Sequence, residues 1–239
     1  MEPGVEQGLK FVARCGGADA AAATADFLAT VGKMGFDAAA CGAWVGVGKN
    51  RRNRFFFLHW PADWLEFYNS NRGFEHDLLP IEARRRVAPY LWSDIRAGKL
   101  TAAQKAFCDA GWAYGWREAF AVPIHGPGNL QGLVTVATRK SRVIEARERA
   151  VLEAMARAVF ERCRTSEGFG MPSAERPHLS AREIECLQWA AAGKSDADIG
   201  TLIGIKPATA HFHVEQAKRK LGVRTRVEAV AVGVLHGVI

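Results

Sequence analysis

The chain has 239 residues, and its 32 Lys and Arg against 25 Asp and Glu leave a formal net charge of +7. Hydrophobic residues make up 49% and charged residues 24%, which excludes a disordered chain, a collagen-like fibre and a disulfide scaffold. The positive charge indicates an anionic partner such as nucleic acid, and the five scattered cysteines, with no CxxC pair, argue against a metal site.

The start of the chain lacks the cationic stretch and apolar core of a signal peptide. No later apolar run reaches the roughly 18 residues that a membrane helix needs. We therefore expect a cytoplasmic protein that makes no membrane contact.

The first predicted elements are helices around one pair of strands. Residues 20–34 predict an Ala-rich helix, and residues 40–48 and 54–60 predict a hairpin around a basic turn. Further helices are expected over 61–71, which opens with a proline suited to a first helical turn, and over 101–114.

A second hairpin and a long helix complete this part of the chain. Residues 119–125 and 130–138 are apolar strands separated by the turn sequence GPGN. Residues 144–163 predict a helix with one apolar stripe, which we expect both to cover the sheet and to contact a second copy of the chain. Strand pairs flanked by helices predict an α/β/α sandwich around an antiparallel sheet.

The composition changes near residues 165–177, where Gly, Pro and Ser are typical of a linker. We expect a larger domain over 1–164, a linker over 165–178 and a small helical domain over 179–239. The whole chain is then an α+β protein.

The C-terminal segment predicts four short helices. Capping boxes, in which a Ser or Thr and an acidic residue three positions later bond each other's backbone, begin at Ser180, Ser195 and Thr225. The remaining helix begins near Pro207, and each helix is followed by a glycine. Only residues 204–206 join the second of these helices to the third, which is the pattern of a helix-turn-helix.

The third helix of this segment is expected to enter the major groove of double-stranded DNA. We expect Phe212, Ala217 and Leu221 to face the protein core. Polar side chains near the start of such a helix read base edges, while basic ones hold phosphates. The expected DNA-binding residues are Lys206, Thr209, His211, His213, Glu215, Gln216, Lys218, Arg219, Lys220, Arg224 and Arg226.

This segment resembles the LuxR-type helix-turn-helix over nearly all of 179–239. The residues that carry the resemblance include Leu-Ser-x-Arg-Glu-x-x-x-Leu at 179–187, Gly193-Lys194-Ser195, Thr209, His213 and Lys220-Leu221-Gly222-Val223. Three positions depart from the family. Gly200 and Ala210 replace the usual Ala and Val, which we expect to weaken packing, and Lys206 replaces a Ser or Thr cap, at a cost of about 1 kcal/mol.

Trp64, Tyr68, Asp77 and Trp92 follow the spacing W-x3-Y-x8-D-x14-W, which resembles the autoinducer-binding domain of LuxR-type quorum-sensing regulators. The resemblance implies that an acyl-homoserine lactone binds there. Asp77 would accept a hydrogen bond from the ligand amide N–H, Trp64 would donate to the lactone carbonyl and Tyr68 to the amide carbonyl. Trp92 would form a flat wall beside the lactone ring. The donors and acceptors of these side chains match those of the ligand.

Further residues are expected in this pocket: Trp60, Trp116, Ala119, Ala121 and Thr135. Two positions depart from the family, because Leu78 replaces a common Pro and Ala119 replaces a common Gly. The methyl group of Ala119 would shift the ligand head. Trp116 would shorten the space for the tail and favour a short or branched acyl chain.

Together these features predict a quorum-sensing transcriptional regulator with no catalytic residue and no cofactor other than its effector. It would bind promoter DNA as a homodimer, with RNA polymerase as a further partner. One alternative is a LuxR-type regulator of a different small molecule. The other is a phosphorylation-controlled response regulator, although the early region lacks the acidic pair of a receiver domain. The sequence GVGK at 46–49 does not complete a phosphate-binding loop, since position 43 is Ala and Asn50 follows the lysine.

Overall fold

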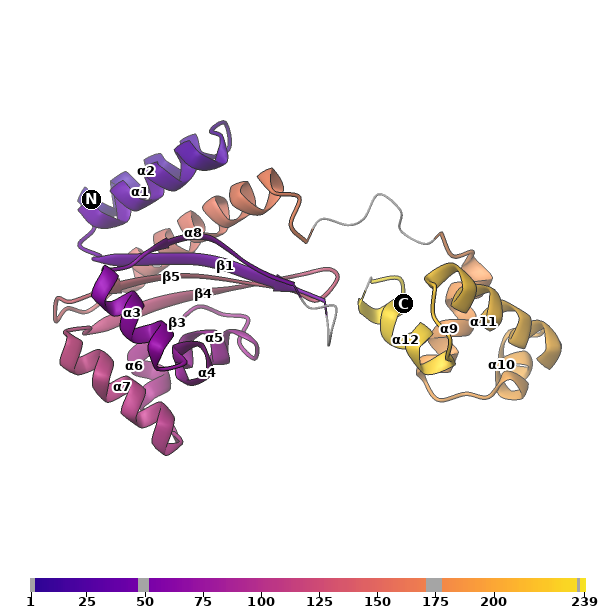
Figure 1. The fold of residues 1–239 in the computed structure, drawn as a ribbon. Coiled ribbons are helices and arrows are strands. Elements are labelled where there is room, and N and C mark those ends of the chain that lie inside the picture. Colours follow the sequence, from indigo (N-terminus) through magenta and orange to yellow (C-terminus); the bar gives the residue numbers. More distant parts are fainter. Residues whose placement is uncertain (1–2, 47–51, 171–177, 236) are drawn as a thin grey trace. The chain divides into compact units, whose positions relative to one another are not determined.

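The computed structural model describes residues 3–46, 52–170, 178–235 and 237–239. This described part forms two compact units, one with helices α1–α8 and the strands and one with helices α9–α12 (Figure 1). Residues 47–51 of the first predicted hairpin, with part of the GVGK sequence, and residues 171–177 of the predicted linker lie outside the described residues.

The strands of the first unit form one antiparallel sheet in the order β2-β1-β5-β4-β3 among the described residues. Their bounds are β1 (Ala38–Val45), β2 (Arg52–His59), β3 (Tyr90–Leu91), β4 (Glu118–Gly126) and β5 (Leu130–Thr138). Both predicted hairpins are present, and β1 pairs with β5 to join them. The middle of β4 is continuously buried because helices cover both faces of the sheet, so the predicted sandwich is confirmed.

Helices α1 (Pro3–Cys15), α2 (Ala20–Lys33) and α8 (Ala146–Ser166) cover one face of the sheet (Figure 1). The predicted stripe of α8, from Val151 to Cys163, is buried. The sequence did not predict α1. This helix packs closely on α8, because a Cβ atom at Gly8 would lie 2.3 Å from Val151 Cγ1.

Shorter helices cover the opposite face (Figure 1). They are α3 (Ala62–Ser70), α4 (Gly73–His76), α5 (Leu78–Ala83), α6 (Trp92–Arg96) and α7 (Ala102–Tyr114). A capping box of Thr101 and Gln104 starts α7, and Gly115 ends it with a φ of 115° that favours glycine. The helices predicted over 61–71 and 101–114 therefore both lie on this face.

The second unit consists of α9 (Ala181–Ala191), α10 (Asp196–Ile203), α11 (Pro207–Leu221) and α12 (Arg226–Leu235). All three predicted capping boxes are formed, at Ser180, Ser195 and Thr225. Lys206, at the N-cap of α11, makes no side-chain capping bond, as expected. These local interactions place α10 and α11 as consecutive helices joined by a short turn.

Two expectations for the second unit are wrong. Phe212 does not face the core, since its side chain is 55% exposed and the buried stripe of α11 is Ala210, Val214 and Ala217. Their spacing of four and three residues places them on one side of the helix, which Phe212 does not share. Gly200 does not weaken packing either. A Cβ atom there would lie 2.7 Å from the carbonyl oxygen of Ile205, so the tight turn before α11 needs a glycine.

Candidate functional sites

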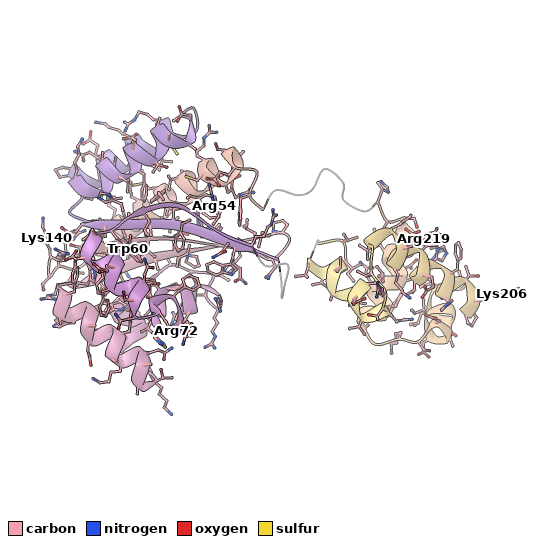
Figure 2. The ribbon with its side chains drawn as sticks, viewed as in Figure 1. Arg54, Trp60, Arg72, Lys140, Lys206 and Arg219 are labelled. Carbon is pink, nitrogen blue, oxygen red and sulfur yellow. The ribbon has the colours of Figure 1, made fainter. Side chains whose placement is uncertain are left out.

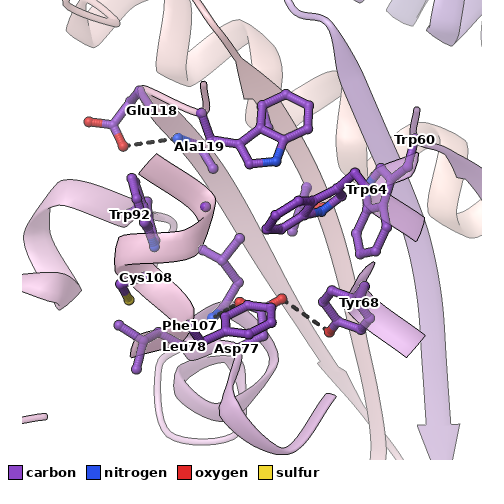
Figure 3. A pocket seen from close by; sticks show the side chains of 15 residues that line it. Trp60, Trp64, Tyr68, Asp77, Leu78, Trp92, Phe107, Cys108, Glu118 and Ala119 are labelled. Carbon is purple, nitrogen blue, oxygen red and sulfur yellow. Dashed lines mark hydrogen bonds between the residues drawn. The ribbon is translucent and has the colours of Figure 1, made fainter. Parts of the chain in front are cut away.

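A cavity of about 70 Å³ lies between the sheet and the helices α3 to α7 (Figure 3). Eight of the nine residues predicted for the ligand pocket line it: Trp60, Trp64, Tyr68, Asp77, Trp92, Trp116, Ala119 and Thr135. Ala121 does not line it, because this residue is fully buried in a neighbouring apolar cluster with Tyr90 and Leu133. The structure thus gathers residues from two helices, two strands and the segments between them around one space.

Trp64 and Tyr68 lie one turn apart on α3, and both are buried. The Trp64 ring contacts those of Phe67, Tyr114 and Trp116, which hold its orientation. Among the side chains that line the cavity, Figure 3 shows no hydrogen bond from the indole N–H of Trp64. It is therefore available as a donor to a molecule in the cavity.

Asp77 and Tyr68 bond each other across the cavity (Figure 3). The Tyr68 hydroxyl donates to Asp77 Oδ2 at 3.2 Å, and the backbone N–H of Leu79 donates to Asp77 Oδ1 at 3.0 Å. Burial raises the pKa of Asp77 to about 6, against the opposing effect of these two hydrogen bonds. Gly73 makes room for the Tyr68 ring, because a Cβ atom there would lie 2.6 Å from it.

Trp92 begins α6 and forms a buried part of the cavity wall. The guanidinium of Arg96 lies 5.0 Å from the centre of its ring, on the same helix, and a cation over an aromatic face holds that ring in place. Leu78 and Ala119, the two departures from the family pattern, both line the cavity. Both departures therefore lie at the wall of the cavity.

Sequence reasoning missed the contribution of α7. Phe107, Cys108 and Gly111 line the cavity from this helix, at a spacing of one and three residues that a helical face provides. Leu79, Glu118 and Ala137 complete the lining that was not predicted. The helix itself was predicted, but its periodicity could not tell which neighbour its inner face meets.

The second unit contains all the predicted DNA-binding residues, but three of them hold its helices together. His211 Nδ1 lies 2.9 Å from Asp196 Oδ2 on α10, and Arg226 bonds the same carboxylate and the carbonyl oxygen of Lys194. Lys220 Nζ lies 2.8 Å from Glu183 Oε2 on α9. Although burial opposes it, the hydrogen bonds from Arg226 and His211 lower the pKa of Asp196.

The other predicted DNA-binding residues point outward or lie at the edge of α11. Lys206, Thr209, Glu215, Arg219 and Arg224 are exposed, and His213, Gln216 and Lys218 are half-buried. Lys218 bonds Glu215 at 2.6 Å, and Arg219 bonds Gln216, both within the helix. Figure 2 shows Lys206 and Arg219 on the surface of this unit. The outward face of α11 therefore mixes hydrogen-bonding and basic groups.

Within the described ranges, no helix is long and apolar enough to cross a membrane. The described residues also contain no group of three or more His, Cys, Asp or Glu side chains that could hold a metal ion.

Comparisons with known proteins match two families, one in the N-terminal part of the chain and one in the C-terminal part. Residues 19–163 match the family described as autoinducer binding domain, and residues 177–232 match bacterial regulatory proteins, luxR family. The transcriptional activator protein AhyR of Aeromonas hydrophila is 26% identical over 211 residues, which cover 86% of this chain and 81% of that protein. The transcriptional activator protein BjaR1 of Bradyrhizobium diazoefficiens is 29% identical over 75% of this chain and 74% of its own.

A solved structure shares the fold. The crystal structure of Escherichia coli SdiA covers 97% of both chains with a TM-score of 0.63 at 16% sequence identity.

Proposed function

Because the chain belongs to the family of LuxR-type regulatory proteins with an autoinducer-binding domain, we propose that its N-terminal cavity binds an acyl-homoserine lactone-type signal. The chain is a DNA-binding transcriptional regulator of the quorum-sensing class. The proposal concerns the ligand, the residues that hold it and the assembly that binds DNA.

The observation that carries the proposal is the set of polar groups in the cavity. Asp77 supplies an acceptor, and the Trp64 indole and the Tyr68 hydroxyl supply donors, all within a wall of apolar and aromatic side chains. An acyl-homoserine lactone has one amide N–H, one amide carbonyl and one lactone carbonyl. The groups of the cavity therefore complement the ligand, as expected for a small-molecule site with few polar contacts.

Ligand binding would exchange one hydrogen bond for two. The ligand amide N–H would donate to Asp77 Oδ2, which now accepts the Tyr68 hydroxyl. The hydroxyl, once released, can turn to donate to the amide carbonyl of the ligand. A donor aimed at the carboxylate also favours the ionised form of Asp77, whose pKa burial has raised.

The size of the cavity supports a short or branched acyl chain. Its volume of about 70 Å³ is far below the roughly 300 Å³ at which typical ligand pockets begin. The rings of Trp60, Phe107 and Trp116 occupy the space beside Trp64. Any acyl-homoserine lactone therefore requires some of these rings to move, and each further carbon of the acyl chain requires a larger movement that costs more free energy.

DNA binding would use two copies of the chain. Symmetric half-sites in promoter DNA match a two-fold symmetric protein, with one α11 helix in each half-site. The regulator would act in the cytoplasm, as a homodimer and beside RNA polymerase where it activates transcription. This part of the proposal rests on the helix-turn-helix and on the outward basic groups of α11.

The test is ligand binding by the full chain and its variants. The chain is purified from cells grown with a series of acyl-homoserine lactones, organic extracts are analysed by mass spectrometry, and affinity is measured by calorimetry. Asp77→Ala should lose a charge-assisted hydrogen bond of about 1.5–3 kcal/mol, or roughly 10–100-fold in affinity. Glu66→Ala, which removes an exposed carboxylate from α3, is the matched control and should bind like the wild type. Wild-type affinity in Asp77→Ala would overturn the pocket assignment.

A further inference from the structure

Phe212 is an exposed aromatic residue in the first half of α11. At 3.6 residues per turn, its side chain points about 170° away from the mean direction of Ala210, Val214 and Ala217. Those three residues are buried against the rest of the unit. Phe212 therefore lies on the face of α11 that is directed away from the protein.

Contacts on both edges of α11 confirm which face is open. On one edge His211 bonds Asp196 of α10, and on the other Lys220 bonds Glu183 of α9. Between these edges lies Phe212, and Arg219 follows on the same face two turns later. The centre of the open face thus has an apolar ring near the start of the helix and a guanidinium near its end.

We propose that Phe212 contacts the C5 methyl group of a thymine in the major groove and so determines part of the DNA sequence preference. This inference rests on the proposed DNA binding by α11. The thymine methyl is the apolar group that a base pair presents in the major groove, and an apolar side chain such as Phe can recognise it. A phenylalanine offers no hydrogen bond to any other base edge.

The charged neighbours fit nucleic acid as the occupant of this face. Arg219 is exposed on it, and Arg224 is exposed just beyond the end of the helix. Basic groups at such positions hold phosphates and set the depth of the helix in the groove. The apolar ring of Phe212, nearer the start of the helix than these two residues, gains contact area when a methyl group meets it.

The experiment removes only the methyl group from the DNA. Full-length wild-type chain, with and without the acyl-homoserine lactones above, selects duplexes from a randomised DNA library. In an enriched duplex each thymine is then replaced by deoxyuridine, one position at a time, and affinity is measured. Burial of one methyl group corresponds to about a fourfold change, so one thymine in each half-site should weaken wild-type binding by about that factor.

The variants assign the effect to the residue. Phe212→Ala should bind the thymine and deoxyuridine duplexes equally, and Phe212→Leu should keep part of the difference. Leu202→Ala, at another exposed apolar residue of the unit, should discriminate like the wild type. If Phe212→Ala still discriminates, or if no thymine replacement weakens the wild type, the inference is overturned while DNA binding stands. If the wild type enriches no duplex in any condition, the proposed function fails and the inference fails with it.

Discussion

The two faces of the sheet in the first unit are both buried, but different kinds of side chain cover them. Toward α1, α2 and α8 the side chains are mainly aliphatic and Phe, packed around Leu152, Met155 and Phe160. Toward α3 to α7 several Trp and Tyr rings lie among Leu, Ile and Ala side chains, together with the carboxylate of Asp77. The same sheet therefore has one face that stabilises the fold and one that leaves space for a ligand.

The space around two glycine residues shows how the packing of the two faces differs. On the first face a Cβ atom at Gly132 would lie 2.3 Å from the Phe160 ring. On the second face a Cβ atom at Gly111 would lie 3.5 Å from Trp64, which is ordinary contact. Gly132 therefore has no room for a methyl group, whereas Gly111 beside the cavity does. Each of the following predictions tests this contrast.

The largest effect is expected for Phe160→Ala on the densely packed face. Phe160 is almost fully buried, and its loss should cost about 3–5 kcal/mol of unfolding free energy. Phe107→Ala, its counterpart on the cavity face, should cost less because that ring is only partly buried beside an existing cavity. Denaturant unfolding of the full chain, followed by tryptophan fluorescence, measures both. Equal losses would contradict the contrast between the faces.

The second prediction concerns pH and the carboxylate on the cavity face. The pKa of Asp77 is about 6 in the folded chain against 3.8 for the ordinary group, so between these values the folded state holds more protons than the unfolded state. The unfolding free energy contributed by Asp77 should therefore fall as pH rises, by about 3 kcal/mol over the whole titration and by about 2 kcal/mol between pH 4 and pH 6.

Unfolding free energies of the ligand-free chain across this pH range provide the measurement. Asp77→Asn should remove this fall, and Glu66→Gln should keep it. A wild type and an Asp77→Asn variant with parallel pH profiles would show that Asp77 titrates normally.

A smaller loss is expected for Gly132→Ala. The added methyl group must push against Phe160, and such overpacking costs about 1–3 kcal/mol. The shift of the denaturation midpoint measures the loss. An unchanged midpoint would mean that α8 can move away from the sheet without cost.

The smallest effect is expected for Gly111→Ala, with the opposite sign. Gly111 lies inside α7, where Ala is favoured over Gly by about 1 kcal/mol, and its surroundings leave room for the methyl group. The variant should be as stable as the wild type or slightly more stable. Because the added methyl group reduces the space in the cavity, the affinity for the ligand, measured by calorimetry, should fall. A loss of stability like that of Gly132→Ala would show that both faces are packed alike.

Much of the fold could be predicted because its signals are local. Both hairpins, the stripe of α8 and the three capping boxes depend on residues a few positions apart. The helix α1 was missed, although its buried residues Val5, Gly8, Phe11 and Cys15 recur at the three- to four-residue spacing of one helical face. Its buried residues, such as Val5 and Phe11, have their partners on α2 and α8, far along the chain.

Sequence reasoning also failed to predict that the side chain of Phe212 points outward. Phe, Ala and Leu are all apolar, so hydrophobicity alone assigned Phe212 to the core. The buried stripe instead consists of smaller residues, because α11 packs closely on α9 and α10 through Ala210 and Ala217. Position around the helix, and not hydrophobicity alone, decided which residues face inward.

The sequence by itself determined the family, the order of the main elements and the spacing of Trp64, Tyr68, Asp77 and Trp92, since each depends on the order of residues along the chain. Only the tertiary structure decided that these side chains meet Phe107 and Gly111 around one cavity, and that the Tyr68 hydroxyl bonds Asp77. It also decided that His211 and Arg226 hold Asp196 and leave the open face of α11 to other residues. These contacts join residues from separate elements, so they exist only once the helices have packed.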